Sequence, residues 1–172
     1  GMGRKMYVFD ATGKQIEEKP IHGWQTETYA QPDVLDVWSQ FEQSGVITTP
    51  FYTVRLDLPA DDPTIYRTGI LTQDLETGEM KMQEVEPTDI FYFSTAASPT
   101  DKNRIFGAYN FLSSFDMAEG KPLKRVPLPH SYYSVNVSSD GKTVYLGGAM
   151  SDVSAYDAET LEKKGEVQMP DG

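Results

Sequence analysis

The sequence contains no cysteine among its 172 residues, and this absence excludes disulfide bonds, a thiol nucleophile and a cysteine-based zinc site. Basic residues are also few, because 15 Lys and Arg stand against 26 Asp and Glu and give a net charge of −11. Nucleic acids and anionic membranes bind through Lys and Arg, so neither is expected as a partner. No apolar run approaches the ~20 residues of a membrane-spanning helix, and the first residues lack the pattern of a signal peptide.

Residues suited to catalysis are equally scarce. The two histidines, His22 and His130, lie far apart beside prolines or loop residues; a metal site shared with a carboxylate is less expected than local hydrogen bonds. The pair Asp61 and Asp62 fits a solvated acidic turn better than an acid–base pair, which needs two different environments. No glycine-rich phosphate loop and no G-x-S-x-G motif occurs. We therefore expect neither a catalytic residue nor a metal site on this chain.

What the sequence does contain is a module of short strands, seen most clearly in residues 127–165. Residues 133–137 alternate large apolar and small polar side chains, as a half-buried strand does. Residues 139–142 have the composition of a hairpin turn. Three further strands are expected at residues 143–146, 153–157 and 163–169. Four antiparallel strands in about 40 residues is the length of one β-propeller blade.

The same order of strands recurs upstream, at residues 91–95, 104–109 and 112–116. The expected third strands end at aspartates separated by 64, 42 and 41 residues: Asp10, Asp74, Asp116 and Asp157. An aspartate opens a type I turn with its own side chain, and a later glycine takes the left-handed position. The turn after Asp157 has no glycine before Gly165 and is expected to differ from the other three. Turn capping explains these aspartates better than a ring of ligands.

These repeats predict an all-β fold, a β-propeller built from four-stranded antiparallel blades. We expect one partial domain over residues 1–172, with a half blade at 1–19 and blades at about 20–88, 89–129 and 130–172. The half blade has a third strand at 5–10 and a fourth at 14–19, but no earlier strands. Three and a half blades are fewer than the usual four to eight, and no segment supplies a closing strand. The chain is therefore expected to be the C-terminal part of a larger propeller.

Residues 24–63 form the least regular region. Residues 34–38 fit either an inner strand or a short helical turn, and residues 51–56 a second strand. The intervening residues 39–50 are expected to form a polar loop, and an acidic excursion at 59–63 precedes the third strand. In repeat folds such insertions lie in loops, where they either lengthen a connection or carry the binding face.

The aromatic residues that begin inner strands also have two interpretations. Packing between blades explains most of them. Aromatic residues near the mouth of the propeller's central channel could instead form an apolar patch that binds a partner protein. Without further information the sequence predicts a propeller scaffold that has no catalytic machinery of its own.

A family resemblance extends this interpretation. Residues 135–145, VNVSSDGKTVY, look like the YVTN-type propeller repeat. More specifically, the chain resembles the β subunit of quinohemoprotein amine dehydrogenase. The resemblance covers nearly the whole chain and depends on KPIHGWQTETYAQPDVLDVW (19–38), TPFYTVRLD (49–57), YRTGILTQDLETGEM (66–80), FYFSTA (91–96), FGAYNFLSSFD (106–116), KRVPLPHSYYSVNVS (124–138) and AYDAETLEKKG (155–165).

The resemblance implies a subunit of a periplasmic heterotrimer that oxidises primary amines. In that family a small γ subunit carries cysteine tryptophylquinone, and an α subunit, a dihaem cytochrome c, carries two c-type haems. The β subunit is a seven-bladed propeller that supports γ and helps to enclose the quinone pocket. Our chain would be the C-terminal half of such a subunit, with no cofactor of its own, since it lacks the cysteines that haem c and the quinone require.

The same resemblance directs attention to aromatic side chains as the walls of the pocket or the subunit interface. The candidates for this role are Trp24, Tyr29, Phe51, Tyr52, Tyr92 and Tyr132. The alternative function is a stand-alone YVTN-type interaction scaffold that has no enzymatic partners. The presence or absence of γ-like and haem-bearing chains distinguishes the two.

Overall fold

The computed structural model describes residues 5–20, 26–34, 43–87, 90–148 and 150–170. Every regular element in these ranges is a β-strand, and the chain there forms no helix. Consequently the described residues include no helix long and apolar enough to cross a membrane. The all-β class expected from the sequence is confirmed.

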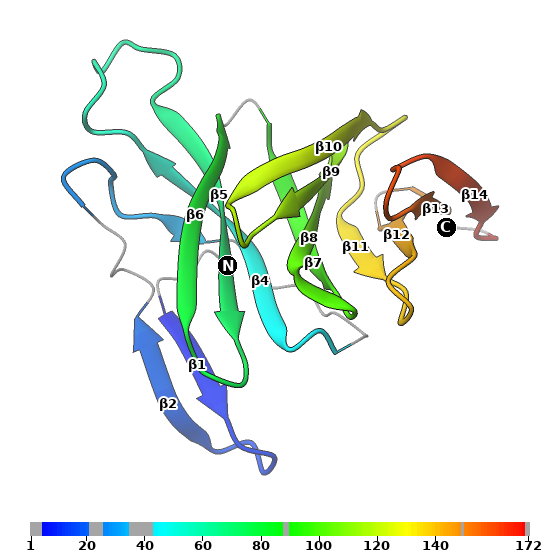
Figure 1. Ribbon diagram of the computed structural model, residues 1–172, viewed down its shortest axis with the longest axis horizontal. Helices are drawn as coiled ribbons and strands as arrows, with labels where there is room; N and C mark the ends of the chain where they lie inside the picture. Colours follow the sequence, from blue (N-terminus) through cyan, green and yellow to red (C-terminus); the bar gives the residue numbers. More distant parts are fainter. Residues whose placement is uncertain (1–4, 21–25, 35–42, 88–89, 149, 171–172) are drawn as a thin grey trace.

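The strands form one two-stranded and three four-stranded antiparallel sheets, each made of consecutive strands (Figure 1). The first sheet contains β1 (Lys5–Phe9) and β2 (Gln15–Pro20). The second contains β3 (Asp33–Val34), β4 (Val46–Val54), β5 (Tyr66–Asp74) and β6 (Met80–Pro87). The third contains β7 (Tyr92–Ser98), β8 (Asp101–Tyr109), β9 (Phe111–Asp116) and β10 (Lys121–Pro127). The fourth contains β11 (Ser134–Val137), β12 (Thr143–Gly147), β13 (Asp152–Asp157) and β14 (Lys163–Gln168).

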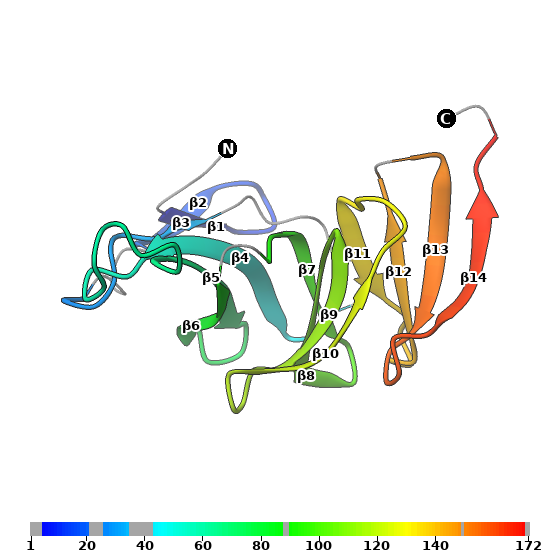
Figure 2. The ribbon, with the colours of Figure 1, turned by 90° about the horizontal axis from the view of Figure 1, so that it is seen from above.

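Successive sheets lie beside one another like the blades of a propeller, with the fourth at one side of the molecule and β14 outermost (Figure 2). No sheet closes on itself, and the described sheets do not complete a ring. The three four-stranded sheets lie within the expected ranges 20–88, 89–129 and 130–172, and the two-stranded sheet extends one residue past the expected half blade at 1–19. The assignment of residues 1–172 to one partial domain stays a prediction, as does the number of blades in a complete ring.

The core lies between the faces of neighbouring sheets. Ile70 of the second sheet packs against Tyr92 and Phe115 of the third. Phe106 and Leu112, on the opposite side of the third sheet, pack against the fourth in a cluster that includes Val135, Val144, Leu146 and Tyr156. Since β-strand side chains alternate between faces, each middle sheet uses one set for each neighbour. Burial of these side chains, at ~25 cal/mol per Å² of apolar surface, is what holds the sheets together.

The repeated aspartates cap turns, as the sequence predicts. The Oδ1 atom of Asp74 accepts hydrogen bonds of 2.9 Å from the backbone N–H groups of Glu76 and Thr77. Asp10, Asp116 and Asp157 do the same for the residues that follow them. A carboxylate that accepts these bonds satisfies N–H groups that the turn would otherwise leave exposed.

The prediction of a different turn after Asp157 is wrong. Leu161 donates its N–H to the carbonyl of Asp157 at 2.9 Å, just as Gly78 does to Asp74 at 2.8 Å. Leu161 has a φ of 60°, in the left-handed region that Gly78 occupies at 73°. The leucine side chain is buried in the core between the third and fourth sheets. Burial therefore offsets a backbone conformation that side chains disfavour.

The expected polar loop at residues 39–50 is also wrong in part. β4 begins at Val46 and pairs with β5 from Val46 to Val54 without interruption. Val46, Thr48 and Thr49 are buried, so these β-branched residues form strand rather than loop. Val34 lies in β3 and pairs with Phe51, while residues 35–38 lie outside the described ranges.

Candidate functional site

The six predicted site residues do not form one cluster. Trp24 lies outside the described residues. Phe51, Tyr92 and Tyr132 have no exposed surface, and Phe51 packs directly over Gly69. Tyr52 and Tyr29 are partly exposed. The buried residues serve the packing between sheets, which was the alternative interpretation of the inner-strand aromatics.

The hydroxyl of Tyr132 belongs to a polar cluster at one end of the fourth sheet. It donates to Oδ2 of Asp152 at 2.6 Å and lies 3.0 Å from Oγ of Ser154. Nε2 of His130 lies 2.8 Å from the other oxygen of Asp152, and the His130 ring lies 4.2 Å from that of Tyr132. Burial, together with the hydrogen bond to Asp152, raises the pKa of Tyr132 to about 12.

The same contacts keep Asp152 ionised. Burial alone would raise the pKa of its carboxyl group. The hydrogen bonds from Tyr132 and Ser154 and the neighbouring His130 outweigh that effect, so the pKa of Asp152 falls below its ordinary value. The cluster links the loop before β11 to the start of β13, and His130 and Asp152 also line a cavity of about 400 Å³ beside the fourth sheet.

Two similar clusters occur in the other four-stranded sheets. Tyr92 donates its hydroxyl to Oε1 of Glu86 at 2.7 Å and lies 2.8 Å from Oγ of Ser113, and Arg125 pairs with Glu86. In the second sheet the hydroxyl of Tyr29 donates to Glu84. Arg55 lies over the Tyr29 ring at 5.3 Å, and Arg67 lies 3.5 Å from Glu84. Each four-stranded sheet thus pairs a tyrosine hydroxyl with a carboxylate and with an arginine or histidine side chain. This recurrence favours a structural role, because a catalytic site has no reason to repeat.

The feature that distinguishes one end of the molecule is a row of partly exposed aromatic rings, which we call the aromatic row. It crosses three sheets and consists of Tyr52, Phe91, Phe93, Tyr109 and Tyr133. Tyr52 and Phe91 stack with their centroids 5.0 Å apart, and Phe93 lies 4.7 Å from Tyr133. Tyr109 lies 5.2 Å from Phe91 and 5.9 Å from Tyr133. Tyr133 is the most exposed member at 38%.

Only Tyr52 of the aromatic row was among the predicted candidates. Three of the other members lie one position away from a predicted residue: Phe91 and Phe93 flank Tyr92, and Tyr133 follows Tyr132. Strand alternation places Phe91 and Phe93 on one face and Tyr92 on the other, but does not indicate which face is buried. Tyr109, at the end of β8, had no signal of its own.

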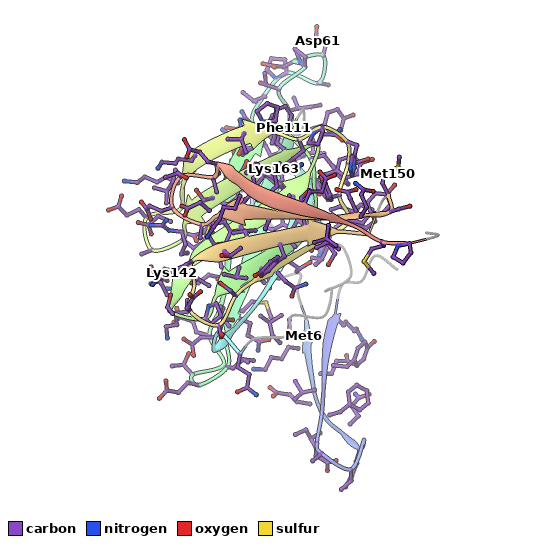
Figure 3. All side chains as sticks on the ribbon, turned by 90° about the vertical axis from the view of Figure 1, so that its right-hand side faces the viewer. Met6, Asp61, Phe111, Lys142, Met150 and Lys163 are labelled. Carbon is purple, nitrogen blue, oxygen red and sulfur yellow. The ribbon has the colours of Figure 1, made fainter. Side chains whose placement is uncertain are left out.

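The loop at residues 55–65 lies at the same end of the molecule as the turn before β9. Figure 3 shows Asp61 at its outer tip, with Phe111 and Met150 toward that end and Lys142 and Met6 toward the other. Asp61, Asp62 and Asp57 give this loop an acidic surface, and Leu56 is exposed within it. The excursion predicted at residues 59–63 is therefore an exposed loop that follows β4, the strand that carries Tyr52 of the aromatic row.

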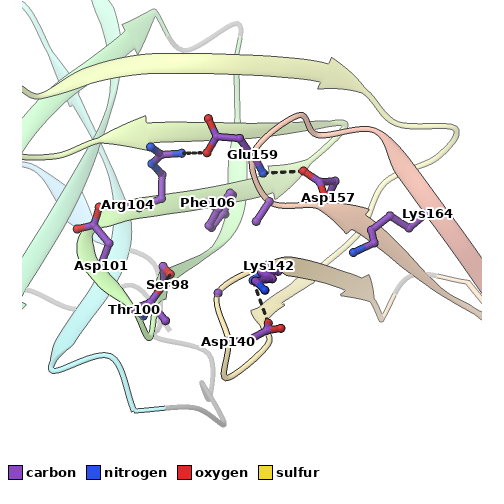
Figure 4. A pocket seen from close by; sticks show the side chains of 12 residues that line it. Ser98, Thr100, Asp101, Arg104, Phe106, Asp140, Lys142, Asp157, Glu159 and Lys164 are labelled. Carbon is purple, nitrogen blue, oxygen red and sulfur yellow. Dashed lines mark hydrogen bonds and ion pairs between the residues drawn. The ribbon is translucent and has the colours of Figure 1, made fainter.

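The described residues contain no group of three His, Cys, Asp or Glu side chains that could hold a metal ion. They do contain polar cavities of about 400 to 440 Å³ between or beside the sheets. Figure 4 shows the one between the third and fourth sheets, where charged side chains of both signs surround the opening.

No protein-family model matches the chain, and no curated protein matches it. Solved structures do. One is a functionally unknown protein from Desulfotomaculum acetoxidans DSM 771, with a TM-score of 0.60 and 19% identity, covering 95% of this chain and 49% of that one. Another is a hydrazine synthase of Kuenenia stuttgartiensis, with a TM-score of 0.56 and 14% identity, covering 97% of this chain and 44% of that one.

These identities establish a shared fold and nothing more. The chain spans about half the length of the structures that it matches. The resemblance to the amine dehydrogenase β subunit therefore stays a prediction from the sequence.

Proposed function

We propose that this chain is a non-catalytic propeller subunit of a periplasmic quinohemoprotein amine dehydrogenase. In that role it supports the quinone-bearing γ subunit and helps to enclose the pocket for a primary amine. The observation that carries the proposal is the aromatic row, because it is a continuous, partly exposed set of rings at the end where loops from three sheets meet. The specific enzyme family depends on the sequence resemblance.

Partly exposed aromatic rings that touch one another are well suited to bind a partner. Tyr and Phe supply large contact areas and lose little conformational entropy when they become ordered, so they are enriched at interfaces. The rings of the aromatic row already hold one another in place through stacked and edge-on contacts. A surface that is ordered before binding has less entropy to lose on association.

The charge of the chain fits the same role. Substrate amines and basic electron carriers are cations, and a net charge of −11 raises their local concentration near the surface. The acidic loop with Asp61 and Asp62 follows β4, the strand that carries Tyr52 of the aromatic row, and Figure 3 shows Asp61 at an outer tip of the molecule. Cysteine tryptophylquinone and the haems would be held by the γ and α subunits, since a chain without cysteine cannot form their thioether bonds.

We further propose that the complete protein is a seven-bladed propeller of which this chain is the C-terminal part. The exposed face of the fourth sheet supports this proposal. Tyr145 pairs with the residue two positions before Asp157, and Phe106 pairs with the residue two positions before Asp116. Tyr145 and Phe106 therefore hold equivalent positions in their sheets. Phe106 is 1% exposed under the fourth sheet, whereas Tyr145 is 44% exposed. An apolar side chain at a position that the repeat elsewhere buries is expected to meet a further sheet.

The test of the proposed role is affinity purification of the full-length chain, tagged in its native host, with partners identified by mass spectrometry. Tyr133→Ala removes the most exposed ring of the aromatic row, and Leu123→Ala removes a similarly exposed side chain of β10 as a control. Truncation of an interface hot spot weakens binding by about 2 kcal/mol or more, roughly 30-fold. We expect γ-like and haem-bearing chains with the wild type and the Leu123 variant, and their loss with the Tyr133 variant. A chain that purifies alone would favour the interaction scaffold instead.

A further inference from the structure

The imidazole ring of His130 lies between two oxygen acceptors. Its Nδ1 atom is 2.9 Å from the backbone carbonyl oxygen of Ser131, and its Nε2 atom is 2.8 Å from Oδ1 of Asp152. A neutral imidazole has one N–H group and donates to only one of these oxygens, whereas an imidazolium ion donates to both. We call this pair of contacts, from the ring to Ser131 and to Asp152, the His130 bridge.

The other ionisable groups around the ring keep their charge state between pH 5 and 8. Burial alone would raise the pKa of Asp152, but its contacts lower that pKa by more, so this carboxyl group stays ionised. Tyr132 stays neutral, since burial and its hydrogen bond raise its pKa to about 12. On β14, Lys163 and Glu166 pair with each other, which raises the pKa of the lysine and lowers that of the glutamate.

These four side chains are the ionisable groups that face the ring among the described residues. Histidine is the side chain whose charge ordinarily changes between pH 5 and 8. In this pH range the charge around the His130 bridge therefore changes at the histidine itself. The bridge is complete while the ring is protonated and loses one of its two hydrogen bonds when the ring becomes neutral.

The hydrogen bond to Ser131 is the one that a neutral ring gives up. The bond to the Asp152 carboxylate is charge-assisted and stronger, so the remaining proton stays on Nε2. The lone pair of Nδ1 then faces the lone pairs of the Ser131 carbonyl, and the two groups repel each other. That carbonyl belongs to the peptide group that joins Ser131 to Tyr132, directly before Tyr133.

Tyr132 and Tyr133 connect the His130 bridge to the aromatic row. The hydroxyl of Tyr132 donates to Oδ2 of Asp152, the carboxylate that the ring contacts through its other oxygen. Tyr133 donates its backbone N–H to the carbonyl of Gly147 at 3.1 Å, and its ring lies 4.7 Å from that of Phe93. A movement of the carbonyl before Tyr132 therefore reaches the most exposed ring of the aromatic row through one intervening residue.

We propose that protonation of His130 fixes Tyr133 in the aromatic row, so that this surface is ordered for a partner at low pH and less ordered at high pH. The effect on docking rests on the proposed subunit role, whereas the effect on Tyr133 does not. A surface that is less ordered before binding loses more entropy on association. Loss of the ordered Tyr133 ring sets the upper limit, so partner binding should weaken by up to about 30-fold between pH 5 and 8.

The test on the protein alone is an NMR titration of the full-length chain, with ¹³C in the rings of histidine and tyrosine. His130→Gln and Tyr133→Phe assign the two signals, because each variant lacks one of them. We expect the Tyr133 signal to shift with the same midpoint as the His130 signal, and this shift to disappear in His130→Gln. A Tyr133 signal that does not change with pH, or that still titrates in His130→Gln, would overturn the proposal.

Asp152→Asn tests the geometry of the bridge. An asparagine side chain can accept a hydrogen bond from a protonated Nε2 or donate one to a neutral Nε2, so the ring no longer needs two protons. We expect Tyr133 to lose its dependence on His130 in this variant. Asp140→Asn is the matched control, because it removes an exposed carboxylate that caps the turn between β11 and β12. An equal loss in both variants would refute the specific role of the bridge, and thermal unfolding midpoints verify that each variant is folded.

Capture of partners by the tagged full-length chain at low and high pH tests the effect on docking. We expect γ-like and haem-bearing chains to be retained better at low pH, and this difference to vanish in His130→Gln. Equal retention at both pH values would contradict the proposed regulation. If Tyr133 follows His130 but no partner is captured at either pH, the bridge is supported and the proposed subunit role fails.

Discussion

Leu161 occupies a position that a glycine, Gly78 or Gly120, fills in two equivalent turns. Its substitution separates the effect of burial from that of backbone conformation. Its φ is 60°, and 1% of its surface is exposed. Leu161→Ala removes the buried side chain but keeps a β-carbon in the left-handed region. Leu161→Gly removes the same side chain and also relieves the backbone strain. The two variants therefore differ chiefly in that strain.

The magnitudes follow from these two contributions. Loss of a buried leucine side chain costs about 2–5 kcal/mol. The left-handed conformation costs a non-glycine residue about 1–2 kcal/mol, and this remains in the alanine variant. Glycine gains backbone entropy in the unfolded state, which offsets part of the relief. We expect Leu161→Gly to be more stable than Leu161→Ala by about 1 kcal/mol, the reverse of the usual order.

Urea unfolding followed by fluorescence measures both free energies of unfolding. Leu112 is the control, since it is equally buried in the same core cluster but lies within strand β9. There glycine should be less stable than alanine by about 0.5–1 kcal/mol, because a strand interior gives glycine no conformational advantage. If both positions rank glycine below alanine, the left-handed conformation at residue 161 carries no backbone strain, and the reasoning is refuted.

Two further predictions concern close packing and a buried hydrogen bond. A β-carbon at Gly69 would lie 2.0 Å from Cζ of Phe51, so Gly69→Ala should destabilise the fold by about 1–3 kcal/mol in urea unfolding. Gly165→Ala, with no atom within 4 Å of the new carbon, should change stability by less than about 0.5 kcal/mol. Tyr132→Phe should cost about 1–3 kcal/mol at pH 7. Burial raises the pKa of the Asp152 carboxyl group, but the hydrogen bond from Tyr132 and its other contacts lower that pKa by more. The stabilisation from this bond is fully present above the pKa of the carboxyl group in the unfolded chain, about 3.9, and is lost as the pH falls further. The wild type should therefore lose more stability than the Tyr132→Phe variant when the pH is lowered from 7 to 3.

The turns and the strand order were predictable because their causes are local. An aspartate that accepts N–H groups two and three residues later carries its own signal, as Asp74 and Asp116 illustrate. Leu161 was not predictable in this way. Its conformation is stabilised by packing against residues of another sheet, which the local sequence around Asp157 does not reveal.

The candidate surface was harder to predict for a related reason. In stacked sheets both faces are covered, so the alternation of buried and exposed positions is weak where Phe91, Tyr92 and Phe93 are all large aromatics. The sequence could not indicate which of them faces the core. Tyr92 packs in the core with Ile70 and Phe115, and its hydroxyl meets Glu86 and Ser113, residues from two other strands.

The polar cavities depend on contacts between hairpins of different sheets. Lys102 of β8 reaches a carboxylate of the neighbouring sheet, with its ammonium 2.6 Å from Oδ2 of Asp74. Sequence spacing does not determine such distances. The ion pair between Lys102 and Asp74 emerges only from the three-dimensional arrangement.

The most direct test of the proposed amine dehydrogenase role is a visible absorption spectrum. The full-length chain would be tagged in its native host, purified from the periplasm under mild conditions, and examined before and after addition of a primary amine. The account predicts co-purified c-type haem bands that become reduced when the amine is added. A colourless protein without partners, or haem bands that do not respond to any primary amine, would contradict it.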